Sequence, residues 1–360
     1  MGVTIKDIAK EAGVSYSTVS RALNGLSLVN AETRDHVLKT AKRMGYMPNA
    51  SAVNLRRNRT YMIGVYFSQI NEMSSPEVLH EVVTAIFDVV KEKYLLVVKG
   101  VDHHVKGSLN PAVFDGIITV TQSESEEDFI KEALDKKIPN VVLNRKSKYP
   151  VDTVMTDEED AMYRSMNYLL EHGHRRIAVL EGPANLTSTI QRHNGWVKAV
   201  KEKGFSEDQF PRFEGDFRYD SGVHLAEAIV GTKATALLSF NDEMAFGVER
   251  VLLRKGCSVP EDLSIIGFDN WNKTMYTSMD LTTVERSMYA IAHEACELLL
   301  RRIEQKKDER EGTKTIYLDA PLIERGSVAQ ISDQQPYPRG SFGRKPLAAA
   351  SSESDKKNKA

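Results

Sequence analysis

Short apolar segments rich in Val and Ile alternate with amphipathic segments from residue 61 to about residue 330. This alternation is typical of parallel sheets whose two faces are covered by helices. The expected strands span residues 62–67, 95–100, 116–120, 140–144, 176–182, 212–215, 236–240, 263–268 and 315–327. The expected helices span residues 76–93, 126–137, 161–173, 190–203, 220–230, 242–255 and 287–306.

The strand and helix pattern restarts after Asp157, which gives two runs of similar length. Two such runs predict two Rossmann-like subdomains with a cleft between them. Ligands of these sheets bind beyond the carboxyl ends of the strands, so the cleft is the expected ligand site.

The first sixty residues have a different character. Apolar residues recur at helical spacing in three short segments, 4–12, 16–24 and 31–44, which predict an all-α head built around a helix-turn-helix. Residues 1–60 hold ten Lys and Arg against four Asp and Glu, a net charge of about +6. The whole chain carries -2, so the remainder carries about -8. A basic head on an acidic body is expected if only the head meets a polyanion.

We therefore expect five regions. Residues 1–47 form the head and residues 48–60, marked by Pro48, form a hinge without a core of its own. The first subdomain comprises residues 61–156 plus about 285–315, and the second comprises 157–284 plus about 316–330. Residues 331–360 are rich in Pro, Gly, Ser, Ala and Lys and read as a disordered tail.

Several motifs carry a resemblance to a known family. TIKDIAKEAGVSYSTVSRALNG, YMPNASAVNLRRNRT, GHRRIAVLEGP, RHNGW, FNDEMAFG and SIIGFDN resemble, in this order, segments of the LacI/GalR family of bacterial transcriptional regulators. The resemblance covers residues 3–330. It implies a helix-turn-helix head joined to an α/β body of the periplasmic-binding-protein type, acting as a repressor controlled by a small-molecule effector such as a sugar or sugar derivative. The implied partners are double-stranded operator DNA and a second copy of the chain in a homodimer; a tetramer stays open.

The resemblance also implies DNA-binding residues. The second helix should lie in the major groove, with Tyr16, Ser17 and Arg21 at base edges. The positions that would contact phosphates are Thr4, Ser15, Thr18, Asn24 and Tyr46; for the hydroxyl groups, helix capping is the alternative role. In the hinge, Leu55 matches a leucine that wedges into the minor groove, flanked by Arg56 and Arg57 at the phosphates.

A second set of residues matches effector-binding positions of the family. They are Arg192, Phe217, Asn241 and Asp269 in the second subdomain, Ser68, Asn144 and Arg145 in the first, and Trp271 as a further aromatic wall. Other roles stay open for three of them: Asp269 as a turn residue, the Asn241–Asp242 pair as a helix N-cap, and Trp271 as a surface or interface residue.

Residues 101–115 depart from the family pattern. Relatives carry a helix between the corresponding strands, whereas this segment is too short for one. The first subdomain is therefore expected to lack a helix at the edge of its sheet, which leaves part of the dimer surface undefined.

Other function classes find little support in the sequence. The chain has no Gly-rich phosphate loop, no G-x-S-x-G and no HExxH, so we expect no enzyme, cofactor or metal site. The His103–His104 and His172–His174 pairs read as surface residues, and Cys257 and Cys296 as reduced thiols. Without a signal peptide or an apolar run of about 18 residues, a cytoplasmic protein that does not enter a membrane is expected. A soluble sugar-binding protein without a regulatory role is the alternative.

Overall fold

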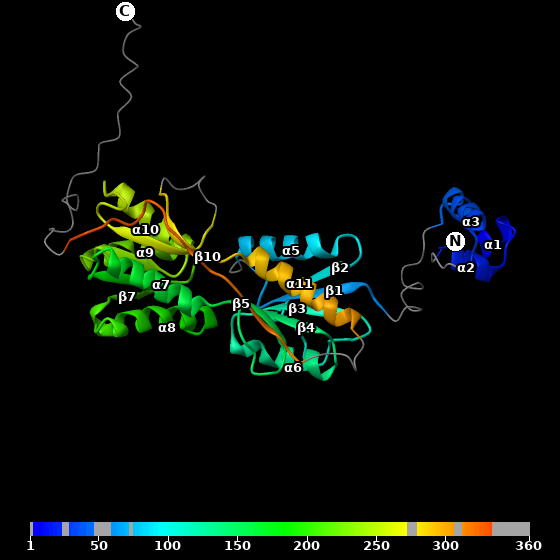
Figure 1. The fold of residues 1–360 in the computed structure, drawn as a ribbon, viewed down its shortest axis with the longest axis horizontal. Coiled ribbons are helices and arrows are strands. Elements are labelled where there is room, and N and C mark those ends of the chain that lie inside the picture. Colours follow the sequence, from blue (N-terminus) through cyan, green and yellow to red (C-terminus); the bar gives the residue numbers. More distant parts are fainter. Residues whose placement is uncertain are drawn as a thin grey trace, which may run out of the picture. The chain divides into compact units, whose positions relative to one another are not determined.

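The computed structural model describes residues 3–23, 29–46, 59–71, 75–271, 279–305 and 312–332. The chain divides into two compact units, Met1–Tyr61 and Met62–Ala360, which are described separately below. The expected fold class is confirmed: a helical head and a body of two mostly parallel sheets covered by helices (Figure 1).

The head packs three helices around one small core. They are α1 (Ile5–Glu11), α2 (Tyr16–Leu23) and α3 (Ala31–Arg43). The core is formed by the apolar faces of all three and contains Ile8, Ala12, Val19, Ala22, Val29, Val37 and Ala41. Gly13 adopts a φ of 64° in the turn before α2, a backbone conformation that glycine reaches without steric cost. Burial of one face of α2 leaves its other face, which includes Tyr16, exposed.

The first sheet of the body is parallel throughout, in the order β11-β5-β4-β3-β1-β2. Its strands are β1 (Met62–Phe67), β2 (Leu95–Gly100), β3 (Gly116–Val120), β4 (Asn140–Leu143), β5 (Asp152–Thr156) and β11 (Thr315–Leu318). Three α-helices accompany it: α5 (Pro76–Val90), α6 (Glu127–Asp135) and α11 (Met288–Glu304). A short 3-10 turn, η1 (Glu124–Glu126), precedes α6. α11 packs against α5 and against β3, β4 and β5.

The second sheet has the order β12-β10-β9-β8-β6-β7, and only β12 runs antiparallel to its neighbour. Its strands are β6 (Ile177–Glu181), β7 (Arg212–Glu214), β8 (Ala236–Ser239), β9 (Ser264–Asp269), β10 (Thr282–Glu285) and β12 (Leu322–Ile323). The helices are α7 (Glu158–Glu171), α8 (Thr187–Glu202), α9 (Tyr219–Gly231) and α10 (Asp242–Arg254), with the 3-10 turn η2 (Glu207–Gln209). Trp196, Phe240 and Phe268 are fully buried in its core.

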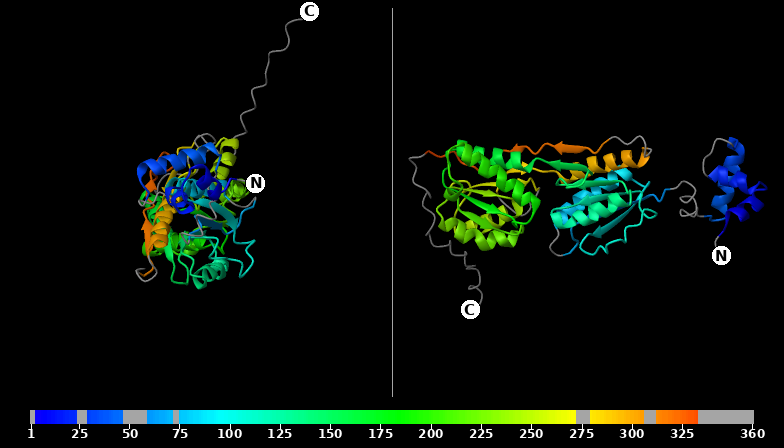
Figure 2. Two further views of the ribbon diagram at one scale, coloured as in Figure 1. Left: turned by 90° about the vertical axis from the view of Figure 1, so that its right-hand side faces the viewer. Right: turned by 90° about the horizontal axis from the view of Figure 1, so that it is seen from below.

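The chain passes between the two sheets three times. It crosses after β5, after β10 and between β11 and β12, where Figure 2 shows the last connection running along the body. The single strand expected over 315–327 is wrong: β11 pairs with β5 in the first sheet and β12 with β10 in the second. Residues 316–318 therefore belong to the first subdomain, because pairing partners distant in the sequence decide which sheet a strand joins.

The segment between β2 and β3 contains no helix, as expected from its length. Glu132 of α6 secures it by accepting hydrogen bonds from the backbone N–H groups of Gly107 (2.8 Å) and Leu109 (3.0 Å) and by contacting the His104 ring (2.9 Å). Burial acts to raise the pKa of Glu132, but these hydrogen bonds prevail and lower it to about 2. β2 remains the edge strand, with 70% of Leu95 exposed.

Two possible features are missing from the described part of the chain. No helix there is long and apolar enough to cross a membrane. Those same residues bring together no group of three or more His, Cys, Asp or Glu side chains that could hold a metal ion.

Candidate effector pocket and DNA-reading helix

A cavity of about 590 Å³ lies within the body, and residues of both subdomains line it. The first subdomain contributes residues that follow β1 and β3 and the start of α5. The second contributes residues from α8, α10 and the ends of its strands. The sequence-derived candidates that line the cavity are Ser68, Arg192, Phe217, Asn241, Asp269 and Trp271. The cavity therefore occupies the expected cleft beyond the strand ends.

Arg192 is almost completely buried and held on several sides. Its Nε donates to Glu158 Oε2 at 2.8 Å and its Nη1 donates to the carbonyl of Phe240. The guanidinium group also lies over the Phe268 ring, 3.7 Å from the ring centroid. Arg192 is thus fixed in place before any ligand arrives.

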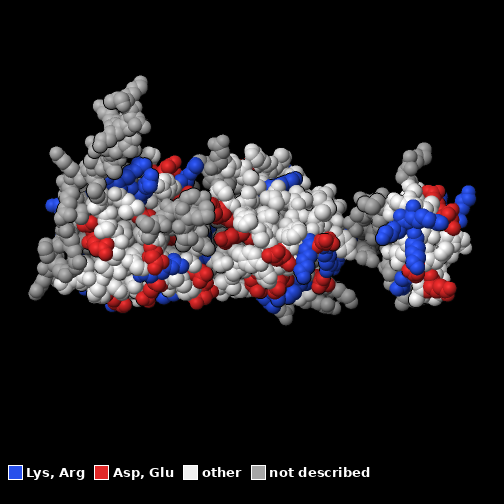
Figure 3. All heavy atoms as spheres, turned by 90° about the horizontal axis from the view of Figure 1, so that it is seen from above, with Lys and Arg blue, Asp and Glu red and all other residues white. Residues whose placement is uncertain are grey.

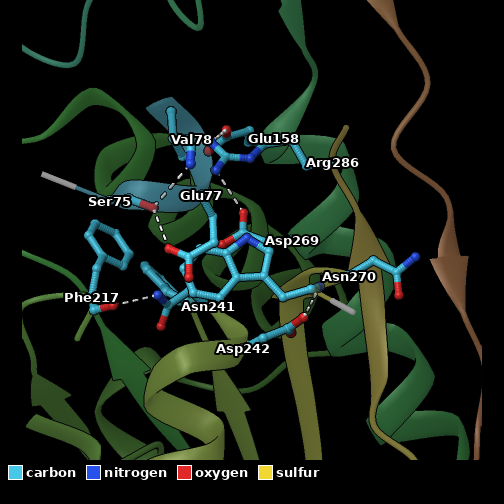
Figure 4. A network of polar contacts seen from close by, with 12 residues as sticks. Ser75, Glu77, Val78, Glu158, Phe217, Asn241, Asp242, Asp269, Asn270 and Arg286 are labelled. Carbon is cyan, nitrogen blue, oxygen red and sulfur yellow. Dashed lines mark hydrogen bonds and ion pairs between the residues drawn. The ribbon is translucent and has the colours of Figure 1, made fainter. Parts of the chain in front are cut away.

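Asp269 and Arg286 complete a buried network of charges (Figure 4). Arg286 Nη2 lies 2.8 Å from Asp269 Oδ1, and its Nη1 lies 3.3 Å from Glu158 Oε1. Arg192 Nη2 is 3.9 Å from the same Asp269 oxygen. Two carboxylates and two guanidinium groups therefore balance one another at this wall of the cavity.

The two carboxylates of this network titrate differently. Burial acts to raise the pKa of Glu158, but Arg192 and Arg286 together hold it below its usual value. Burial raises the pKa of Asp269, and the same arginines only partly oppose this because Glu158 adds a repulsive charge. The hydrogen bonds to both arginines make Glu158 the more firmly ionised member.

Asn241 and Asp242 have separate tasks. Asn241 is the N-cap of α10, accepting from the Met244 N–H at 3.0 Å, and its Nδ2 donates to the Phe217 carbonyl at 2.6 Å. Of the Asn241–Asp242 pair considered as the N-cap, only Asn241 takes that role, and Asp242 does not. It accepts instead from the Trp271 N–H (2.8 Å) and the Thr283 hydroxyl (2.6 Å), and burial together with the nearby Asp269 raises its pKa to about 8.

The backbone around the cavity is unusual at three non-glycine positions. Phe217, Asp269 and Asn270 adopt φ angles of 67°, 111° and 55°. Such conformations cost free energy and cluster at ligand sites, where the surrounding structure holds them. They place the Phe217 and Asp269 side chains at the cavity wall.

Two expected residues of the first subdomain are not among those that line the cavity. Arg145 is 2% exposed and pairs with Glu127 at 2.5 Å, which makes it part of the packing between α6 and the loop after β4. Asn144, which directly follows β4, has a φ of 71° and is also not a wall residue. Both residues follow a strand, as Ser68 does, but Arg145 pairs with Glu127 and neither residue lines the cavity.

Sequence reasoning missed several charged residues of this site, and three of them show why. Glu126 lies in the acidic run SESEED, where nothing distinguishes it from surface residues, yet it is 6% exposed and lines the cavity. Arg286 follows β10, a strand that was not expected. Glu158 precedes the expected start of its helix, so no pattern indicated its role.

The three residues predicted to contact bases lie together on the exposed face of α2. Tyr16, Ser17 and Arg21 are exposed, and Figure 3 shows Lys and Arg side chains in a band across the visible face of the head. Ser15 Oγ accepts from the Thr18 N–H at 3.1 Å, and Thr4 forms a capping box with Asp7, so both hydroxyls have a capping role. Tyr46 packs against the core of the head. The remaining predicted contacts, Asn24, Leu55, Arg56 and Arg57, lie outside the described residues.

The head and the body each match a known family of proteins. Residues 4–49 match the family described as bacterial regulatory proteins, lacI family, and residues 166–328 match a periplasmic binding protein-like domain. The chain is 31% identical to the probable HTH-type transcriptional repressor ExuR of Bacillus subtilis over 92% of its length and 99% of that protein. It is 31% identical to the transcriptional repressor PurR of Vibrio atlanticus, over 91% and 99% of the two chains.

Solved structures extend this likeness to the whole fold. The lac repressor dimer bound to operator and the anti-inducer ONPF aligns with a TM-score of 0.79 and 26% identity over 91% of this chain and all of that chain. The complex of the regulator CelR with cellobiose aligns with a TM-score of 0.65 and 26% identity over 90% and 99% of the two chains. Head, body and cavity thus have one common explanation: the chain belongs to the lacI family of bacterial regulatory proteins.

Proposed function

We propose that the protein is a transcriptional repressor whose affinity for operator DNA is set by a small sugar or sugar derivative bound in the cavity of the body. The observation that supports this most directly is the composition of the cavity wall, which both subdomains supply. A ligand there changes how the two subdomains are held together. Of the similar structures, one carries cellobiose and another, from Enterococcus faecium, carries ribose.

At the DNA end, α2 would lie in the major groove with Tyr16, Ser17 and Arg21 reading bases. Arg21 can form two hydrogen bonds with guanine, and Tyr16 can pack against a thymine methyl group. The predicted wedge Leu55 and its neighbours Arg56 and Arg57 would then kink the operator and contact its phosphates. Such a DNA-binding role would place the protein in the cytoplasm.

At the effector end, Asn241 and Asp269 would meet ligand hydroxyls, while Phe217 and Trp271 would supply an aromatic wall. Arg192 would hold these side chains in place and offer the ligand those N–H groups that Glu158 and the Phe240 carbonyl do not accept. The backbone N–H of Thr187 already donates across the subdomain boundary to the Gln122 carbonyl at 3.0 Å. Closure around a ligand would strengthen or strain this contact, which links the cavity to the orientation of the first subdomain.

A homodimer would present two heads to a palindromic operator. Its interface is proposed to include the first subdomain, where Phe87 of α5 and Leu95 and Val98 of β2 are exposed apolar side chains. The absence of a helix between β2 and β3 leaves these strand residues open to a partner.

The proposal is tested by selecting binding sites from random duplex DNA with the full chain. A palindromic consensus is expected, and the effect of a panel of sugars on binding to it should be measured by fluorescence anisotropy. At least one sugar should change the operator affinity, and Phe217→Ala should weaken that response without weakening DNA binding in its absence. Failure to select any DNA sequence at low salt would reject the regulator; sugar binding without an effect on DNA would favour the non-regulatory alternative.

A further inference from the structure

The charges that line the cavity are unevenly balanced. Among the described residues, five carboxylates and two guanidinium groups form its wall, with no Lys or His. The two cations are Arg192 and Arg286. The five acidic residues are Asp102, Glu126, Asp216, Glu243 and Asp269.

Both arginines are already neutralised by the protein. Arg192 and Arg286 each contact Glu158 within hydrogen-bonding distance, and Arg286 also contacts Asp269. Glu158 and Asp269 together carry as much negative charge as the two arginines carry positive charge. This network therefore offers hydrogen-bond donors to a ligand, but no net positive charge.

Glu126 makes the first-subdomain side of the cavity acidic. It is 6% exposed and accepts hydrogen bonds from the backbone N–H groups of Gln122 (3.2 Å) and Ser123 (3.5 Å). Burial raises the pKa of this carboxyl group, and its hydrogen bonds, together with the nearby Arg145, oppose that only in part. Asp102, from the loop after β2, adds a second carboxylate on the same side, and its nearest basic group is the highly exposed ring of His103 at 3.7 Å.

The second subdomain adds acidic groups across the cavity. Asp216 accepts from the Arg218 N–H at 2.9 Å, a contact with the backbone rather than with a cationic side chain. Glu243, in the first turn of α10, is a further acidic residue on this side of the cavity. A ligand between the subdomains is thus approached by carboxylates from both sides.

The N-terminus of α5 also lies at the described cavity wall, where free N–H groups and the helix dipole attract negative charge. Ser75 and Val78 line the cavity at this end (Figure 4). The chain supplies its own acceptor, however: Ser75 Oγ accepts from the Val78 N–H at 3.3 Å, and Glu77 lies in the same turn. The positive end of α5 is already occupied.

We infer that the effector carries no negative charge at neutral pH: the cavity takes uncharged or amine-bearing polyols and rejects uronates and sugar phosphates. The inference rests on the proposed function, because it assigns a charge class to the ligand of that same cavity. The physical reason is that an anion entering between like charges is repelled, and the described residues that line the cavity offer it no unpaired cation.

The test uses matched sugars that differ only in charge, with thermal shift and titration calorimetry on the full chain. The series are glucose, glucosamine and glucuronate; galactose, galactosamine and galacturonate; and ribose with ribose 5-phosphate. A small-molecule extract of bacterial cells, split by anion exchange, extends the panel. Stabilisation by neutral or amino sugars, or by material that the resin does not retain, is expected. Stabilisation by a uronate, a sugar phosphate or the retained fraction overturns the inference, whereas no response to any sample rejects the effector cavity itself.

Variants separate charge from shape. Glu126→Gln keeps the side-chain volume and removes the charge, so it should raise the affinity for the anionic member of a series, relative to its neutral member, about tenfold. Asp216→Asn should also raise the relative affinity for the anionic member. Because Asp216 is exposed, this variant tests the inference even if Glu126→Gln fails to fold. The matched control is Glu227→Gln, whose carboxylate pairs with Lys255 outside the cavity. An unchanged ratio in both cavity variants would contradict the inference.

Discussion

Helix α2 of the head and the cavity of the body use polar residues in opposite ways. Tyr16, Ser17 and Arg21 are exposed on a short helix, and the packing of the head does not depend on burying them. Arg192 and Asp269 are buried and bound into a network that includes residues far away in the sequence. Changes on the exposed face of α2 should therefore affect function alone, whereas changes in the cavity should affect stability as well.

The largest effect is expected from Glu158→Gln. This change leaves two buried arginines with Asp269 as the only carboxylate of the network, and breaking a buried ion pair costs about 3–5 kcal/mol. Urea unfolding of the full chain measures the loss. Glu159→Gln, one residue further along α7, is the control and should change little. Equal stability of both variants would show that the network does not support the body.

A pH effect should follow from Asp242, whose pKa is raised to about 8 by burial and by Asp269. The native state then holds a proton that the unfolded chain releases near pH 4. Stability should fall as pH rises from about 4 to 8, by at most about 1.4 kcal/mol per pH unit for one group. Melting temperatures across this range should decline less steeply for Asp242→Asn than for the native chain. Parallel curves would mean that Asp242 stays ionised.

Arg21→Ala tests the head, where a change on the exposed face of α2 should affect DNA binding and leave stability unchanged. Loss of a two-pronged guanine contact should weaken operator binding by about 1–3 kcal/mol, while leaving the unfolding curve unchanged. Fluorescence anisotropy with the selected operator measures the first and thermal melting the second. Ser17→Ala should have a smaller effect on binding, because its short side chain specifies little. A drop in stability for Arg21→Ala would break the contrast between head and body.

The smallest effect concerns the local stability of the head. Asn30 Oδ1 caps α3 by accepting from the Thr33 N–H at 2.7 Å, and loss of such a cap costs about 1 kcal/mol. Asn30→Ala should speed hydrogen exchange in α3, and Asn30→Ser should not, since serine also caps helices. Faster exchange in the body as well would indicate that the two units do not unfold separately.

The sequence by itself determined the head and most of the body. The three helices of the head agree with the expected ranges to within one or two residues, since their caps, glycines and apolar faces are local features. The same holds for the largely apolar strands such as β1, β3 and β8. Motif matches also led to Ser68, Arg192, Phe217, Asn241, Asp269 and Trp271, all of which line the cavity.

The tertiary structure decided what depends on distant partners. β5 and β10 were not expected because their polar residues are unlike those of buried strands. Asp152 of β5 is nevertheless buried by a two-pronged contact with Arg302 at 2.7 and 2.8 Å, and Thr283 of β10 by its bond to Asp242. In the same way, Glu126, Glu158 and Arg286 gain their roles only from neighbours that folding brings near. Local patterns fix helices and apolar strands, but the burial of a charge is decided by the partner that compensates it.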